Sequence, residues 1–259
     1  MKLKWFGTAS VLLEYENTKL LFDPFIPLNK KSIKPSINEF ASIKNILVTH
    51  GHVDHISDIP AVIKQGINSV VYCTARPMET LVLKGVDKNR IHKIKPGDVL
   101  DFGPFKINVL RGKHIVFDAI QVIKTLLSPR ILANLGNFRH ILNENKVCSE
   151  AGETVVYEIA AADKRILLMG SLNLDENTEY PKNADLLVLP FQGRSDLDVY
   201  AMDFIKRLEP KKVLLDHFDN SFPPVSSSVD TGTFIKKMKK TFPGIPVICP
   251  EPGELITLF

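Results

Sequence analysis

The sequence has little cysteine, no long hydrophobic run and almost no excess of one charge, and each shortage excludes a class of protein. Its 3 cysteines in 259 residues lie far apart and form no C-x-x-C pair, so they indicate neither a disulfide framework nor a thiolate zinc site. No apolar run approaches the roughly 18 to 20 residues of a membrane-spanning helix. With 33 Lys and Arg against 29 Asp and Glu, the net charge of +4 does not favour a nucleic-acid partner.

The start of the chain lacks the apolar segment and small-residue cleavage site of a secretory signal, so the expected location is the cytoplasm and no membrane contact is expected. No low-complexity linker divides the chain, and one domain over residues 1–259 is therefore expected. The one basic cluster, residues 236–240, reads as the solvated face of a surface helix.

Short apolar runs alternating with helical patterns predict an α/β fold, with helices packed outside the sheets. Strands are predicted over residues 3–6, 11–15, 19–22, 46–49, 107–110, 154–159, 165–169, 186–190 and 213–216. Helices are predicted over residues 59–65, 76–84, 199–208 and 233–240, the first with Ser57 or Asp58 as N-cap. Because a hairpin followed by short buried strands occurs twice, the two halves of the chain look alike.

Residues 115–149 differ from this plan, because apolar and basic side chains alternate there without a strand pattern. We interpret this segment as an inserted helical lid within the domain. Its apolar side chains could fold over a pocket or bury against a second copy in a homo-oligomer, and the sequence leaves both open.

The strongest chemical signal is the run Thr49-His50-Gly51-His52-Val53-Asp54-His55, which follows a predicted buried strand and precedes a predicted helix. It places three of the chain's 7 histidines and one carboxylate within six residues. Imidazole suits zinc, iron and manganese, and a carboxylate widens the choice toward harder ions. The spacing predicts that His50 and His52 share one metal ion, while Asp54 and His55 face a second ion beside it.

This run resembles the His-x-His-x-Asp-His signature of the metallo-β-lactamase fold superfamily, and the resemblance spans nearly the whole chain. It implies a four-layer αββα sandwich. Residues 5–10 and 21–24 look most similar to the branch that contains L-ascorbate-6-phosphate lactonase. Carried over residue by residue, the resemblance implies His114 as the third ligand of the first metal and His217 as the last ligand of the second. Asp23 is implied to orient the ligand-bearing loops without being a ligand.

The chain departs from the family pattern at Ser171, where the aspartate that bridges two metals is expected. A neutral hydroxyl cannot replace a bridging anion, so the second site, left with Asp54, His55 and His217, should be weakened. Asp175 could reach back to fill the gap, or waters held by Ser171 could do so. We therefore expect one or two zinc ions, with manganese or iron as alternatives.

These ligands predict a metal-dependent hydrolase, in which a metal-bound hydroxide attacks an ester, lactone or phosphoester and Asp54 orients the nucleophile and carries its proton. The expected substrate is a small and anionic molecule, because Arg194 follows a strand beside the family's pocket and could grip a phosphate or carboxylate. Lys124, Arg130 and Arg139 of the lid point the same way. The alternative is a catalytically degenerate protein that only binds a metal or ligand, because Ser171 replaces the bridging aspartate. A nuclease is not expected, since no extended basic face is evident.

Overall fold

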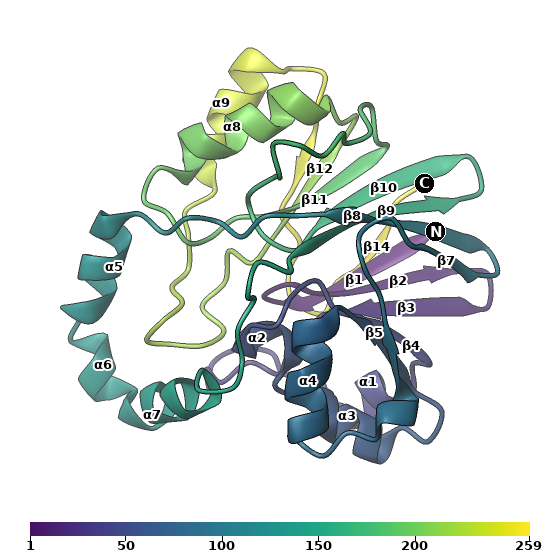
Figure 1. Cartoon of the computed structure of the whole chain (residues 1–259). Helices are drawn as coiled ribbons and strands as arrows, with labels where there is room; N and C mark the ends of the chain where they lie inside the picture. The colour runs from purple at the N-terminus through teal and green to yellow at the C-terminus, as the bar shows by residue number, and fades with distance from the viewer.

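Two seven-stranded sheets pack face to face in the computed structural model, which describes residues 1–259 apart from the side chains of residues 121, 122 and 126 (Figure 1). From edge to edge, the first sheet contains β14 (Leu255–Thr257), β1 (Lys2–Gly7), β2 (Ser10–Tyr15), β3 (Thr18–Phe22), β4 (Asn45–Leu47), β5 (Val70–Cys73) and β6 (Ile91–Lys93). The second contains β13 (Val247–Ile248), β12 (Val213–Asp216), β11 (Leu186–Pro190), β10 (Lys164–Met169), β9 (Val155–Ala161), β8 (Phe105–Arg111) and β7 (Val99–Phe102).

The two sheets share one connectivity. In the first, β2 and β3 form an antiparallel hairpin, and β4, β5 and β6 then add in parallel. In the second, β9 and β10 form the hairpin, and β11, β12 and β13 add in parallel. The similarity of the two halves that the sequence indicates is therefore present in the sheets.

Helices cover the outer face of each sheet, which gives four layers and confirms the predicted α/β fold class (Figure 1). The first sheet carries α1 (Ile37–Ala41), α3 (Ile59–Gln65) and α4 (Ala75–Leu83), with a 3₁₀ turn at Lys88–Arg90. The second carries α8 (Leu197–Leu208) and α9 (Gly232–Thr241). Among the described residues, every helix is too short or too polar to span a lipid bilayer.

Strand residues are apolar on both faces because each sheet is covered on both sides. Trp5, Phe22 and Tyr157 are fully buried between the sheets. Their neighbours Phe6 and Leu21 point to the opposite face and pack beneath the helices of the first sheet. The period-two alternation of strand side chains thus builds an inner core and an outer core from the same strands.

The segment with the predicted helical insertion lies between β8 and β9 and forms an arc at one side of the sandwich (Figure 1). It contains α5 (Ala119–Leu126), α6 (Arg130–Ala133) and α7 (Leu135–Glu144). Arg130 ties it to the loop after β12 by donating to the Asn220 side chain at 2.8 Å and to the Ser226 carbonyl at 2.7 Å. An ion pair between Lys84 and Glu144 ties α7 to α4.

Candidate metal centre

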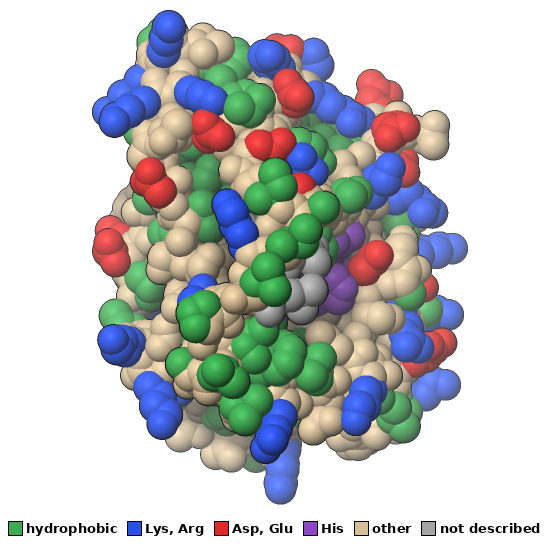
Figure 2. Space-filling model, turned by 90° about the vertical axis from the view of Figure 1, so that its left-hand side faces the viewer, with side chains coloured by type: hydrophobic (Ala, Val, Ile, Leu, Met, Phe, Trp, Pro, Cys, Tyr) green, Lys and Arg blue, Asp and Glu red, His purple; other side chains and the backbone are tan. Residues whose placement is uncertain are grey.

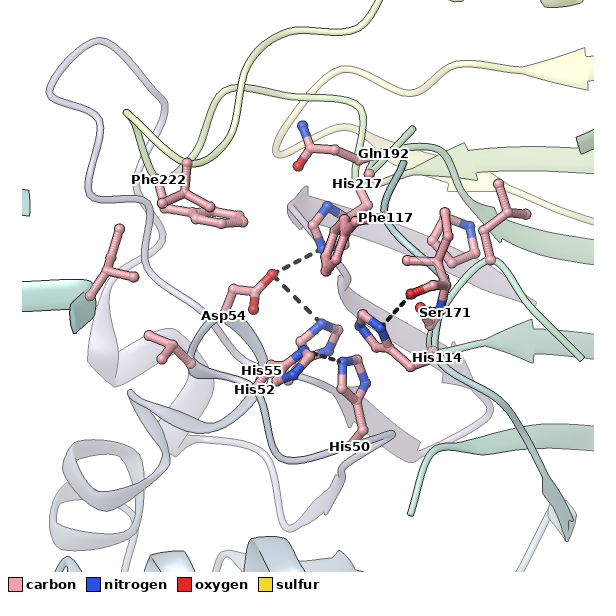
Figure 3. Close-up of a pocket in the computed structure, with 18 of the residues that line it drawn as sticks. His50, His52, Asp54, His55, His114, Phe117, Ser171, Gln192, His217 and Phe222 are labelled. Carbon is pink, nitrogen blue, oxygen red and sulfur yellow. Dashed lines mark hydrogen bonds and ion pairs between the residues drawn. The ribbon is translucent and has the colours of Figure 1, made fainter. Parts of the chain in front are cut away.

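Polar loops from both sheets meet at one end of the sandwich, around a pocket of about 360 Å³ (Figure 3). The first sheet contributes Asp23, directly after β3, and residues 49–55, which follow β4 and include the short helix α2 (Val53–Ile56). The second sheet contributes His114 after β8, residues 170–171 after β10 and His217 after β12. Segments far apart in sequence thus place their imidazoles and carboxylates in one wall.

His50, His52 and His114 form the first of two groups at this wall, with one nitrogen of each lying within 4.8 Å of the others. His50 Nε2 and His52 Nδ1 face each other at 3.2 Å. Two nitrogens bound to one tetrahedral zinc ion lie about 3.3 Å apart, given Zn–N bonds of about 2.0–2.1 Å. His114 Nδ1 lies 2.9 Å from the Ile115 carbonyl and donates to it, which leaves the Nε2 lone pair free to bind a metal.

A buried network behind the histidines sets their tautomers. Asp23 accepts from the Thr49 backbone N–H at 2.8 Å and from the Thr49 hydroxyl at 2.6 Å. Because that hydroxyl donates to Asp23, it accepts from Nδ1–H of His50 at 3.0 Å. His55 Nδ1 donates to Asp23 at 2.8 Å. Nε2 is therefore the ring nitrogen of His50 and His55 that this network leaves unbound, and the orienting role of Asp23 stays a prediction.

Asp54, His55 and His217 form the second group. Asp54 Oδ2 lies 3.0 Å from His217 Nε2 and 3.7 Å from His55 Nε2, and Figure 3 shows the carboxylate between the two rings. The grouping matches the predicted division of the signature, with His50 and His52 on one side and Asp54 and His55 on the other. Their roles as metal ligands remain a prediction.

The two groups differ in charge. Burial lowers the pKa of His52 to about 4, with the neighbouring imidazoles adding to the effect, and burial also holds the pKa of His50 well below its usual range. Both rings are neutral at pH 7. Burial opposes charge on His217 as well, but the hydrogen bond and charge of Asp54 outweigh it and raise the pKa of His217 to about 9. Asp54 thus favours a positive charge on His217.

This donor set fits divalent metal ions. The first group offers three nitrogens as ligands, and the second offers two nitrogens and a carboxylate oxygen. Zinc, iron and manganese accept such sets, and the nature of the ligands alone does not select one of them. In addition, His217 Nδ1 is buried without a hydrogen-bond partner among the described residues, so the second group contains a polar atom that the protein itself does not satisfy.

Ser171 lines the pocket, but its hydroxyl serves the protein backbone. Its side chain is 5% exposed, and Oγ accepts from the Ile115 N–H at 3.0 Å. The structure does not bring Asp175 to either group, because its carboxylate accepts from the Asn177 N–H at 3.1 Å and the Thr178 hydroxyl at 2.8 Å. Asp175 therefore caps a turn and does not reach back to the gap at Ser171.

Two features that the sequence reasoning missed shape this wall. A Cβ atom at Gly170 would lie 2.2 Å from Thr49 Cβ, so only glycine permits the second sheet to approach the ligand loop this closely. His217 adopts a φ of 60°, in the left-handed region that a side chain rarely occupies, and its N–H donates to the Thr8 carbonyl at 2.8 Å. No local sequence signal marks either contact, since both join residues far apart in the chain.

Asp216 is a buried carboxyl group next to His217 in sequence, and the sequence analysis did not name it as a site residue. Burial raises its pKa to about 7, and its Oδ1 atom has no hydrogen-bond partner among the described residues. Asp216 ends β12, and an aspartate at the end of such an apolar run is the sequence signal that could have found it.

The basic residues predicted to bind an anionic substrate lie elsewhere. Arg194 donates to the Asp196 carboxylate at 2.7 and 2.8 Å and to the Val116 carbonyl at 3.1 Å, and it is not among the described residues that line the pocket. Lys124 and Arg139 are exposed on the insertion, and Arg130 donates to Asn220 and Ser226 in the loop after β12. The structure thus removes the reason for expecting an anion grip at this pocket.

The comparisons with known proteins agree with this architecture. A family model described as "Beta-lactamase superfamily domain" matches residues 2–217. Proteins named UPF0173 metal-dependent hydrolase are similar over the full length of both chains, at 26% identity in Methylobacterium nodulans and 25% in Carboxydothermus hydrogenoformans.

Among solved structures, Igni18, a metallo hydrolase of Ignicoccus hospitalis, is 17% identical with a TM-score of 0.65, covering 98% of this chain and 97% of that one. An isothiocyanate hydrolase from Delia radicum gut bacteria is 15% identical with a TM-score of 0.62, covering 99% of both chains. At these identities the likeness shows the shared fold.

Proposed function

The chain belongs to the beta-lactamase superfamily, and from this premise we propose that it is a metal-dependent hydrolase acting on an ester, lactone or phosphoester of a small molecule. The observation that carries the proposal is that six side chains able to bind a metal lie in two groups on the wall of a pocket. The names of the full-length relatives support it.

We assign His50, His52 and His114 to one ion and Asp54, His55 and His217 to a second, with zinc as the proposed metal. When bound, a divalent ion supplies a Lewis acid that polarises the bond to be cleaved and lowers the pKa of water. The Asp23–Thr49 network keeps the ligand lone pairs of His50 and His55 directed at the site.

Asp54 has the role of orienting the attacking water. The neighbouring imidazoles outweigh burial and hold the pKa of Asp54 well below its usual range. The carboxylate therefore stays ionised at neutral pH and accepts a hydrogen bond from water in the pocket, while its low basicity makes orientation its larger contribution.

A second candidate function, a protein that binds a metal or ligand without turnover, is favoured by one observation. Where a bridging carboxylate is expected, Ser171 presents a hydroxyl already hydrogen-bonded to the Ile115 N–H. Restoring the charge by Ser171→Asp separates the candidates. If the natural protein is a binder, the variant gains a second tight metal site and activity from none.

The first test of the hydrolase is metal content per chain, measured by elemental mass spectrometry on untagged protein purified without chelator. It is combined with hydrolysis of a panel of esters, lactones and phosphodiesters with metal restored. We expect metal in the purified protein and turnover that chelation abolishes. Protein that carries metal and hydrolyses nothing would contradict the proposal and favour the binder.

The narrower resemblance to the L-ascorbate-6-phosphate lactonase branch stays a prediction, supported by residues 5–10 and 21–24. A lactone is accordingly included in the panel. Homo-oligomer formation through the insertion also stays a prediction, and sedimentation analysis of the purified protein tests it.

A further inference from the structure

Two phenyl rings stand beside the candidate metal ligands. The Phe117 ring lies 5.6 Å from the His114 ring, and the Phe222 ring lies 6.0 Å from the His217 ring. Figure 3 shows both phenyl rings at the pocket that the ligands face. A substrate whose scissile bond lies at the ligands would therefore contact hydrocarbon on both sides.

The lining beyond the ligands is mostly apolar as well, with Thr125, Asn145, Ser171 and Gln192 as its polar side chains among the described residues. Its members come from both sheets, the insertion and the loop after β12, and include Val53, Ile115, Ile141, Leu172 and Val225. None of the described residues that line the pocket is Lys or Arg. The three side chains outside the description belong to Gln, Val and Leu and carry no charge.

The apolar lining continues to the surface. Phe117 is 53% exposed and Val225 is 40% exposed, although both line the pocket. Figure 2 shows histidine side chains at this surface, close to hydrophobic side chains. The amide nitrogen of Gln192, a polar group in the lining, donates to the Ser227 carbonyl at 2.7 Å.

Resting on the proposed function, we infer that the substrate carries an uncharged, apolar group beyond the scissile bond, as in a medium-chain or aryl ester or lactone. A charged group placed there would lose water and find no Lys or Arg among the described lining residues, which is costly. An apolar group gains about fourfold in binding for each methylene that it buries.

A matched pair of esters tests the inference. 4-Nitrophenyl hexanoate and mono-4-nitrophenyl adipate share the leaving group and the six-carbon acyl length, and they differ in one distal carboxylate. We expect kcat/KM at least tenfold higher for the hexanoate, and about tenfold higher for the hexanoate than for the butyrate. Binding of the corresponding 4-nitroanilides, measured by calorimetry on the purified protein, should show the same order without turnover.

A charge placed at the rim gives a second measurement. Val225→Arg puts a cation in the lining and should shift the hexanoate-to-adipate ratio at least tenfold toward the adipate. Val99→Arg is the control, because Val99 is 55% exposed on β7 and does not line the pocket. It should leave the ratio unchanged.

The outcomes separate the inference from the proposed function. Hydrolysis of the adipate as fast as, or faster than, the hexanoate would overturn the inference while leaving a hydrolase. If metal-loaded protein hydrolyses no ester, lactone or phosphodiester of the panel, the proposed function fails, and the anilide binding order alone then decides the inference. Equal binding of the two anilides would contradict it.

Discussion

The two sheets share one connectivity but carry different chemistry at equivalent strand ends. Asp23 follows β3 in the first sheet, and Ser171 lies two residues beyond β10 in the second, each after the second strand of the hairpin. Asp23 accepts from the backbone and hydroxyl of Thr49 and from His55, which aligns the ligand loop. Ser171 accepts from the Ile115 backbone.

This difference gives the two halves different tasks. The first half supplies four of the six candidate ligands from one loop, already oriented by a buried carboxylate. The second half supplies His114 and His217 from separate strand ends, and one of them is held in a left-handed backbone conformation. Connectivity therefore fixes where a loop emerges, while single side chains at the strand ends decide what it does.

Removing a ligand from the first half should have the largest effect on function. His52→Ala leaves His50 and His114 as the first group, and a two-nitrogen site holds metal poorly. We expect the loss of metal and of kcat/KM to exceed the roughly 10–100-fold that removal of an orienting partner costs. Metal content and ester hydrolysis measure it. His92→Ala is the control, because His92 stacks on Tyr72 away from the pocket, and equal losses in both variants would contradict the assignment.

The contact between the halves should be the next most sensitive point. Gly170→Ala places a Cβ atom 2.2 Å from Thr49 Cβ and should destabilise the fold by about 2–4 kcal/mol, as overpacking does. Gly136→Ala, on α7, meets nothing within 4 Å and should stabilise by about 0.5–1 kcal/mol. Denaturant unfolding measures both, and equal midpoints would show that the two halves do not meet as described.

Exchanging the orienting groups sharpens the comparison. Asp23→Asn turns an NH₂ toward donors on Thr49 or His55, so the histidine tautomers are disturbed. We expect metal affinity to fall about 10–100-fold, measured by chelator competition. Ser171→Ala is the equivalent change in the second half. It should lower metal affinity by less than about tenfold, because it removes only the acceptor of the Ile115 N–H. Similar losses would mean that the two strand ends act alike.

Much of the fold was predictable because the strands are short apolar runs and the helices carry apolar side chains at helical spacing. The helix predicted over residues 59–65 matches α3, and the strands of both hairpins lie where they were predicted. The strands β5, β6, β7, β13 and β14 were not predicted, because each has only two to four residues, too few to show a clear period. The residues of both candidate metal groups were named from the signature and the family pattern, whereas Gly170 and the backbone N–H of His217 make contacts between distant segments.

Arg194 marks the limit of such reasoning at the pocket. Its place after β11 suggested an anion grip, but position along the chain does not reveal which partner a long side chain will choose. Asp196, two residues on, binds the guanidinium through both carboxylate oxygens. The apolar lining of the pocket is built from separate loops, so only the structure shows which of their side chains meet.

The smallest predicted effect compares the helices that follow equivalent strands, α3 after β4 and α8 after β11. Asp58 precedes α3, and burial outweighs a hydrogen bond from the Ile26 N–H and raises the pKa of Asp58 to about 6. Asp196 precedes α8, and the hydrogen bond from Arg194 outweighs burial and lowers the pKa of Asp196. Equivalent positions therefore titrate in opposite directions.

The raised pKa of Asp58 means that its protonated form favours the folded state at low pH, and that this stability is lost as the pH rises from about 4 through about 6. Asp58→Asn should remove this loss. The unfolding free energy of the variant minus that of wild type should therefore rise by about 2 kcal/mol from pH 4 to pH 7. Wild-type Asp196 contributes stability that is present above about pH 4 and lost on acidification. Asp196→Asn should therefore lose stability relative to wild type as the pH rises, by less than about 1 kcal/mol because that carboxylate is exposed. Equal slopes in the two variants would mean that burial of Asp58 is not what distinguishes the first half from the second at this position.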